Sequence, residues 1–239
     1  MTVLKVILCI LFGYLAGSIN PAYIIGRLRG FDIRQKGSGN AGASNALITM
    51  GKAVGLVSML FDIAKGGVVF LTAPLIFADL PLAAEMAGTA CMLGHMFPFY
   101  MKFRGGKGLA TLGGIILCID WRLFLIMLSA EIVLVLITDY ICVVPITASI
   151  ALPPLYALLG AGGTNWLLHA TGGRWGALIF AAATVAILYR HVINIRRIFK
   201  GQEMHFSFLW KKDKQAEIDR VTGNSGAEQK TAADEGGKQ

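Results

Sequence analysis

The chain has 239 residues, of which 55% are hydrophobic and only 15% are charged. An average soluble domain is about a quarter charged. The shortage of charge therefore argues against a disordered chain, a nucleic-acid-binding protein and an ordinary soluble enzyme. It indicates a protein whose surroundings are largely lipid.

The net charge of +8 belongs to residues 1–210, because the residues from Lys211 onward include six basic and six acidic side chains. Basic loops beside apolar stretches are typical of the cytoplasmic side of a membrane protein. We therefore expect these cations to meet membrane lipids or substrate, and no nucleic acid. The four cysteines form no C-x-x-C pair, so we expect neither a disulfide framework nor a zinc site, and no cofactor.

Seven apolar stretches follow one another along the chain. They are residues 3–26, 53–78, 82–101, 109–120, 122–138, 141–160 and 175–199. A helix needs about 20 apolar residues to cross a bilayer. The two short stretches are therefore either two tightly turned crossings or one re-entrant pair. The expected fold is an all-α polytopic membrane protein with seven transmembrane helices, five being the alternative, in one domain over residues 1–210.

Lysine and arginine side chains gather in three places: after the first stretch, after the third and at the end of the last. These cations are Arg27, Arg29, Arg34, Lys36 and Lys52, then Lys102, Arg104 and Lys107, then Arg190, Arg196, Arg197, Lys200, Lys211 and Lys212. The connection around Leu80 has none. Because cytoplasmic loops are enriched in Lys and Arg, we expect the N-terminus outside and the C-terminus in the cytoplasm.

The two ends of the chain have simpler interpretations. A signal peptide would also explain Lys5, the apolar run that follows it and the small residues 16–18. Another apolar stretch begins at residue 53, however, so no soluble domain follows for export. The segment 211–239 is polar and has no aromatic residue after position 214, which predicts a disordered tail.

Ionisable residues within apolar stretches are costly in lipid, so each indicates a structural or functional need. Asp62 and Lys65 share one helix face at i, i+3 and can pair, either to lock two helices together or to shape a substrate site. Glu131 has no cation nearby in the sequence. His95, near the end of the third stretch, is a packing residue or a catalytic one.

The segment 34–45 contains three glycines, two serines and two asparagines between cations. Glycine permits positive φ and close backbone approach, and successive backbone N–H groups can form an anion-binding concavity. Serine and asparagine add neutral donors and acceptors for hydroxyl groups. The segment therefore predicts a binding loop more than a flexible linker.

The second segment runs from Gly94 through the string Gly105-Gly106-Lys107-Gly108. It lacks the spacing and the Ser/Thr of a nucleotide-binding P-loop. A lysine among glycines ahead of a helix still suits a small phosphate. The third segment begins at Arg190 and places His191 and Asn194 three apart on one helix face.

These three segments, in this order, resemble those of the bacterial acyl-phosphate:glycerol-3-phosphate acyltransferases (PlsY-type), over about residues 13–208. The matching strings are 17–21, 36–45, 62–66, 94–111, 190–191 and 194–195. The resemblance implies seven helices and three cytoplasmic motif loops. It also implies transfer of an acyl group from acyl phosphate to the sn-1 hydroxyl of glycerol 3-phosphate, which gives lysophosphatidic acid.

The resemblance also implies roles for single residues. The implied catalytic residues are Ser38, His191 and Asn194; the implied substrate-binding residues are Gly37, Gly39, Asn40, Asn45, Gly105, Gly106, Lys107 and Gly108; and the supporting residues are Asp62, Lys65, His95 and Glu203. We expect Lys107 to hold the acceptor phosphate and Ser38 and Asn40 to bind the acyl phosphate head or the oxyanion. We expect His191, oriented by Asn194, to take the proton, unless substrate phosphate takes it.

The chain also departs from the family pattern. Ile48 stands where an arginine is usual, the string from Asp139 to Cys142 replaces Arg-Tyr-x-Ser, and residues 192–193 replace Arg-Glu. Loss of a cation beside a phosphate removes about 1.5–3 kcal/mol. Two alternatives therefore stay open: an enzyme with another acceptor, and a non-catalytic membrane protein that binds lipid or phosphate.

The expected location is the bacterial plasma (inner) membrane, with the active site facing the cytoplasm. The expected partners are the acyl phosphate donor, the glycerol 3-phosphate acceptor, membrane lipids and the soluble enzyme that makes acyl phosphate.

Overall fold

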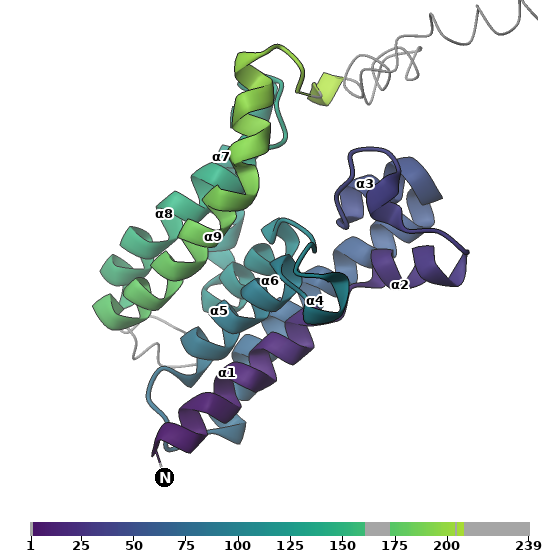
Figure 1. Ribbon diagram of the computed structural model, residues 1–239. Helices are drawn as coiled ribbons and strands as arrows, with labels where there is room; N and C mark the ends of the chain where they lie inside the picture. The colour runs from purple at the N-terminus through teal and green to yellow at the C-terminus, as the bar shows by residue number, and fades with distance from the viewer. Residues whose placement is uncertain (1, 161–172, 204, 208–239) are drawn as a thin grey trace, which may run out of the picture.

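The computed structural model describes residues 2–160, 173–203 and 205–207, and the predicted tail 211–239 lies outside them. The described chain is helical and contains no strand. Its helices are α1 (Thr2–Ser18), α2 (Pro21–Leu28), η1 (Ile33–Gln35), α3 (Ala43–Met50), α4 (Lys52–Ile76), α5 (Ala83–Met96), η2 (Phe99–Met101), α6 (Leu109–Ile119), α7 (Trp121–Thr138), α8 (Val143–Gly160) and α9 (Gly173–Phe199). Helices α1, α4, α5 and α6 occupy the centre, with α2 and α3 to one side and α7–α9 to the other (Figure 1).

Each predicted apolar stretch contains a helix, but two of the stretches are not one continuous helix. The stretch 3–26 divides into α1 and α2, which bend by 47° at the break before Pro21. There the Asn20 side chain caps α2 by accepting from the Tyr23 N–H at 2.9 Å. The stretch 82–101 ends as a helix at Met96, because Pro98 disfavours helical backbone at Phe97, whose φ and ψ are −130° and 57°.

Small residues allow the central helices to approach closely. A Cβ on Gly13 of α1 would lie 2.2 Å from the Ala87 carbonyl oxygen of α5, and a Cβ on Gly17 would lie 2.0 Å from the Cys91 carbonyl oxygen. Gly114 of α6 meets the backbone of α4 in the same way, at Ile63. Such backbone proximity is what holds helices together in lipid, where burial of apolar side chains gives little driving force.

Contacts along the helices show their relative directions. α1 and α5 are parallel, since Gly13 faces Ala87 and Gly17 faces Cys91. α7 and α8 are antiparallel, with the Thr147 hydroxyl 2.8 Å from the Glu131 carboxylate; this is the partner that the sequence left unidentified. α8 and α9 are also antiparallel. α4 and α5 are antiparallel as well, since Lys65 meets His95 while Phe70 meets Gly88, and these long helices alternate in direction. The segments after α2, α5, α7 and α9 contact one another at one end of the bundle, through Arg34–Met101, Arg190–Gly105 and Asp139–Ser207.

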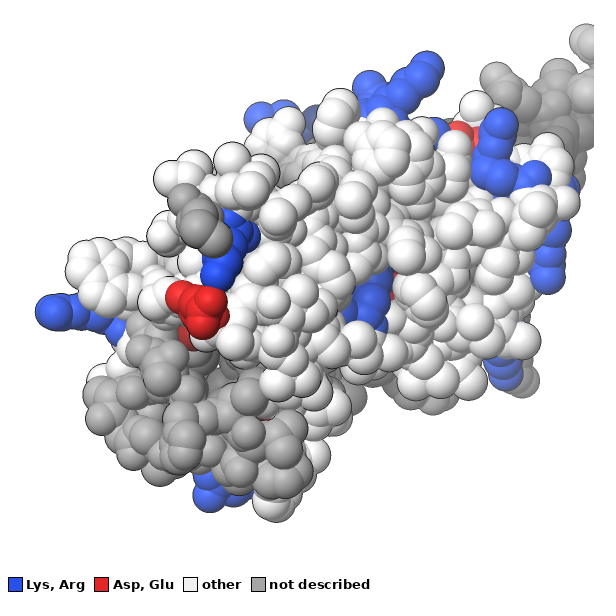
Figure 2. Space-filling view, turned by 90° about the horizontal axis from the view of Figure 1, so that it is seen from below, with Lys and Arg blue, Asp and Glu red and all other residues white. Residues whose placement is uncertain are grey.

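The outer surface is apolar. On α7, for example, only Leu123, Met127 and Val135 are buried, while Ile126 and Ile137 are 67% and 76% exposed. Uncharged side chains cover most of the face in Figure 2. Among the described residues α4, α7 and α9 are each long and apolar enough to cross a membrane, and α1 with α2 would add a fourth crossing. An apolar exterior of this extent fits a lipid environment.

Candidate active site

The loop of residues 36–42 is braced from inside by Asn45. The Asn45 amide donates to the carbonyl oxygens of Ile33, Lys36 and Asn40 at 2.8–3.0 Å, and its own carbonyl accepts the Ser38 N–H at 2.9 Å. These bonds occupy the Asn45 side chain. Asn45 therefore braces the loop from beneath in this structure, and the substrate-binding role that we expected for it stays a prediction.

Two glycines give the loop its shape. Gly37 and Gly39 have φ of 56° and 75°, which other residues rarely adopt. A Cβ on Gly37 would lie 2.3 Å from Asn45 Oδ1, so close approach at this point also requires glycine. The loop is thus a fixed turn.

Ser38 and Asn40 keep polar groups available on this turn. The Ser38 hydroxyl makes no hydrogen bond to the described residues, and Asn40 Oδ1 is buried without a donor among them. A buried acceptor of this kind is usually satisfied by something further. Both groups therefore suit binding of a polar ligand.

Contacts from the flanking elements join the first loop to the second. The Asn20 amide donates to the Ala41 carbonyl at 2.8 Å, and Arg34 donates to the Met101 carbonyl at 2.5 Å. Arg34 is itself held by Asp32 at 2.6 Å, an interaction that lowers the pKa of Asp32. Sequence reasoning did not identify Asn20 as an anchor of this loop.

The glycine loop of residues 105–108 folds back onto the end of α5. Gly106 N–H donates to the His95 carbonyl at 3.0 Å, and Gly105 N–H to the Met96 carbonyl at 3.0 Å. A Cβ on Gly106 would lie 2.1 Å from His95 Nε2. The loop can rest on the imidazole only because residue 106 has no side chain.

A buried cluster of Asp62, Lys65 and His95 supports this loop. The Lys65 ammonium lies 2.6 Å from Asp62 Oδ1 and 2.9 Å from His95 Nδ1, and it donates to the Ile19 carbonyl at 2.8 Å. The predicted Asp62–Lys65 pair is therefore present. It joins α4 to α5 and to the break after α1.

Helix α9 contributes the third set of groups. Arg190 donates to the carbonyls of Gly105 at 2.7 Å and of Gly106 at 3.3 Å, a contact that the sequence did not reveal. His191 is buried, and its Nδ1 lies 2.8 Å from the Ile187 carbonyl. Since a carbonyl only accepts, Nδ1 carries the proton and Nε2 of the neutral ring has the free lone pair.

Asn194 joins two charged groups. Its Oδ1 accepts from the Lys107 ammonium at 2.7 Å, and its Nδ2 donates to Glu203 Oε1 at 2.7 Å. We expected Asn194 to orient His191, but the Ile187 carbonyl does that. Burial lowers the pKa of Lys107 and the nearby Glu203 carboxylate opposes the shift.

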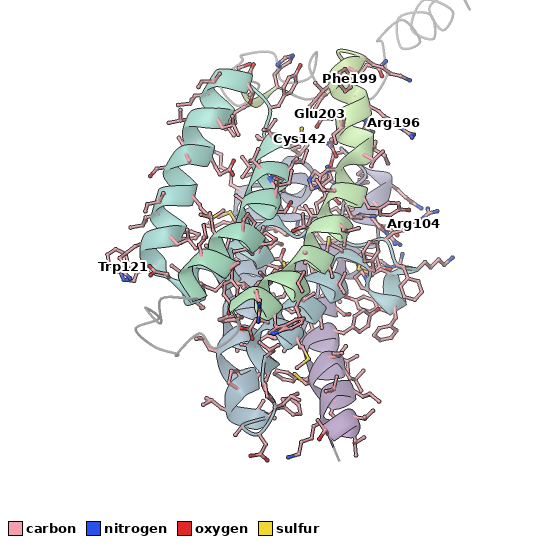
Figure 3. All side chains as sticks on the ribbon, turned by 90° about the vertical axis from the view of Figure 1, so that its left-hand side faces the viewer. Arg104, Trp121, Cys142, Arg196, Phe199 and Glu203 are labelled. Carbon is pink, nitrogen blue, oxygen red and sulfur yellow. The ribbon has the colours of Figure 1, made fainter. Side chains whose placement is uncertain are left out.

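The positions that depart from the family pattern have distinct surroundings. Ile48 is a half-buried apolar residue of α3. The Cys142 thiol is buried beside Glu203, and burial first, then that carboxylate, raises its pKa to about 12. Cys142 and Glu203 lie near the end of α9 (Figure 3). Asp139 contacts the chain beyond α9 through Ser207.

The described residues contain no group of three His, Cys, Asp or Glu side chains placed to hold a metal ion. Two loops and the end of α9 meet at one end of an apolar helical bundle, through the Arg34–Met101 and Arg190–Gly105 contacts, and present hydroxyl, amide, ammonium and imidazole groups. This arrangement defines a class of membrane protein that handles a phosphorylated substrate beside the bilayer.

Comparisons with known proteins identify the family. The profile described as "Glycerol-3-phosphate acyltransferase" matches residues 7–201, and the chain belongs to this family. Glycerol-3-phosphate acyltransferase of Lactiplantibacillus plantarum is 36% identical over 216 residues, which cover 89% of this chain and 99% of that protein. The Bacillus subtilis enzyme is 34% identical over 204 residues, covering 84% and 98%.

The fold is shared with a solved member of the family. The crystal structure of PlsY (YgiH), an integral membrane glycerol 3-phosphate acyltransferase, in its glycerol 3-phosphate form superposes with a TM-score of 0.70 at 32% identity, covering 85% of this chain and 96% of that one. The lysophosphatidic acid form gives a TM-score of 0.66 at 30% identity, covering 84% and 94%. The family predicted from the motif strings is confirmed.

Proposed function

We propose that this protein transfers a fatty acyl group from an acyl phosphate to the sn-1 hydroxyl of glycerol 3-phosphate. The observation that carries the proposal is the Lys107–Asn194–Glu203 chain beside the glycine loop and His191. It holds the Lys107 ammonium near the buried His191 imidazole, whose Nε2 has the lone pair that can accept a proton. Arg190 donates to the carbonyls of the adjacent Gly105 and Gly106. Family membership supports the acceptor and the product.

The acceptor phosphate binds at Lys107 and at the backbone N–H groups where the glycine loop leads into α6, because the Gly105 and Gly106 N–H groups already donate to Met96 and His95. An ammonium and backbone N–H groups at the start of α6 both favour a dianion. Lys107 keeps its hydrogen bond to Asn194 while it binds the phosphate, and this bond holds the ammonium in place. The sn-1 hydroxyl then lies toward His191.

The acyl phosphate head binds at the turn of residues 36–42. The Ser38 hydroxyl and the Asn40 Nδ2 group, together with backbone N–H groups, donate to the oxyanion that forms on the acyl carbonyl, while the buried Asn40 Oδ1 accepts from a hydroxyl of the substrate. Rigid bracing by Asn45 keeps these donors fixed, so little reorganisation accompanies the reaction. The acyl chain lies against the apolar outer surface of the helices, at bilayer depth.

Transfer proceeds by direct attack. The sn-1 oxygen forms a bond to the acyl carbon, the bond from that carbon to the phosphate oxygen breaks, and inorganic phosphate leaves. His191 Nε2 takes the hydroxyl proton. Phosphate is a good leaving group, and holding the two substrates together supplies about 7–11 kcal/mol, so no covalent acyl intermediate is needed.

The membrane arrangement follows the alternating helices. We propose seven crossings, the N-terminus outside and the motif end in the cytoplasm of a bacterial inner membrane, with residues 1–210 as one domain. The support is that Arg34, Lys107 and Arg190 all lie at the motif end, which the positive-inside rule assigns to the cytoplasm. Acyl phosphate would then come from a soluble cytoplasmic enzyme.

The experiment is an assay of the detergent-purified protein with palmitoyl phosphate and radiolabelled glycerol 3-phosphate, alongside the Bacillus subtilis enzyme. We expect labelled lysophosphatidate and released phosphate in equal amounts. Palmitoyl-CoA in place of palmitoyl phosphate tests the donor, and another polyol phosphate tests the acceptor, which the apolar Ile48 would alter. Absence of any acylated product, with the Bacillus enzyme active, would leave only a binding function.

A further inference from the structure

The chain turns back on itself after α9. Gly201 has a φ of 64°, and Gln202 N–H donates to the Arg197 carbonyl at 2.8 Å, a bond that closes the end of the helix. This reversal brings Glu203 under the last turns of α9, where Oε1 accepts from Asn194. Glu203 is thus delivered to the phosphate subsite by a segment outside the helical bundle.

The same segment is fixed at its other side by Asp139, the residue that ends α7. Asp139 Oδ1 accepts the Ser207 N–H at 2.7 Å and Oδ2 accepts the Ser207 hydroxyl at 2.8 Å. The Asp139 carbonyl accepts the Phe206 N–H at 2.7 Å. His205 Nδ1 lies 3.1 Å from Asp139 Oδ2, and its ring stacks on Tyr140 with centroids 4.9 Å apart. We call Asp139, His205 and Ser207 the Asp139 cluster.

The direction of the pKa shift of Asp139 agrees with these contacts. Partial burial alone would raise the pKa of Asp139, but the bonds from Ser207 and the neighbouring His205 outweigh it and lower the pKa. Asp139 has a φ of 59°, a conformation that Asp tolerates better than most residues. The acid that replaces the family's usual arginine therefore has a defined task in this chain.

We propose that the Asp139 cluster is a positioning device for the acceptor subsite: it holds Glu203 against Asn194, and through Asn194 it holds the Lys107 ammonium. The inference rests on the proposed function for its kinetic part. Glu203 is anchored between the Gly201 turn and the Asp139 cluster, and Cys142 is buried beneath it, next to the α7–α8 turn. Releasing the cluster frees Glu203, loosens Lys107 and uncovers Cys142.

The test uses Asp139→Gly, because glycine accepts the positive φ and so removes the carboxylate without straining the backbone. Ser207→Ala removes one bond only. Asp139→Asn keeps one acceptor and tolerates the backbone, so it serves as a conservative rescue. The matched control is Asp120→Ala, which removes another capping aspartate, the one that receives the Arg122 and Leu123 N–H groups at the opposite end of α7.

Two readouts are taken on the full chain. The first is the KM for glycerol 3-phosphate, which we expect to rise about two- to tenfold in Asp139→Gly with kcat within about twofold. The second is the rate at which maleimide labels Cys142, measured by peptide mass spectrometry. We expect it to rise about tenfold, since burial and the Glu203 carboxylate both suppress the thiolate. Ser207→Ala and Asp139→Asn should show smaller changes, and Asp120→Ala neither.

Unchanged labelling of Cys142 in Asp139→Gly, an unchanged KM, or an equal shift of both in Asp120→Ala would each overturn the proposal. If the wild-type protein does not acylate glycerol 3-phosphate, the proposed function fails. The labelling rates then still decide whether the Asp139 cluster holds Glu203 over Cys142.

Discussion

Replacing Lys107 by methionine tests the acceptor subsite most directly. Methionine keeps most of the apolar length of the side chain and removes the ammonium that lies 2.7 Å from Asn194 Oδ1. A charge-assisted hydrogen bond contributes about 1.5–3 kcal/mol, which corresponds to about a 10- to 150-fold loss of kcat/KM for glycerol 3-phosphate. Because the lost contact is to the bound phosphate, most of the loss should appear as a higher KM.

The assay is initial-rate release of phosphate at varied glycerol 3-phosphate and saturating palmitoyl phosphate. Lys102→Met is the matched control, since Lys102 is an exposed cation of the same loop region. A second comparison is Lys107→Met with Asn194→Leu, whose combined loss should be well below the sum of the two, as the side chains form one unit. A KM within twofold of wild type, or an equal effect of Lys102→Met, would refute the assignment of the phosphate to Lys107.

Three further outcomes follow from the same geometry. Asn45→Ala removes the amide that donates to three loop carbonyls, so the activity and the thermal midpoint should both fall. Ser44→Ala, at an exposed neighbour, should leave both near the wild-type values. Equal effects of the two substitutions would contradict the bracing role. Gly106→Ala places a Cβ 2.1 Å from His95 Nε2 and should lower kcat/KM at least about a hundredfold. Gly113→Ala is the control, because the nearest contact of its Cβ is at 3.7 Å, and it should leave kcat/KM unchanged. Activity retained in both variants would contradict the close packing. Because burial lowers the pKa of Lys107 from 10.5 and the cation binds phosphate, kcat/KM for glycerol 3-phosphate should fall with rising pH before pH 10.5 is reached; a profile flat to that pH would contradict this.

Several parts of the site were predictable because they depend on local chemistry. The glycines at 37 and 39 indicated a turn of positive φ, and the Asp62–Lys65 spacing indicated a pair on one helix face. Both are present. The helix end at Met96 could also have been read from Pro98, which restricts the residue before it.

Other contacts lay beyond local reasoning. The partners of Asn45 are backbone carbonyls that converge only once the turn has formed. Arg190 contacts Gly105 from 85 residues away, and no spacing rule connects them. Asn194 was expected to serve its helix neighbour His191, but tertiary packing supplied Lys107 and Glu203, whose charges bind its amide more strongly than a neutral ring would.

The sequence by itself determined that the protein is surrounded by lipid and which chemical groups its site can use. A charge content of 15% and seven apolar stretches indicated lipid, and the glycine, asparagine and lysine strings predicted a loop that binds a polar ligand. Tertiary structure decided how each side chain is used, because a hydrogen bond goes to whichever partner the fold brings within reach. Asp139 makes the difference clear: in sequence it is a missing cation, whereas in the folded chain its carboxylate binds Ser207.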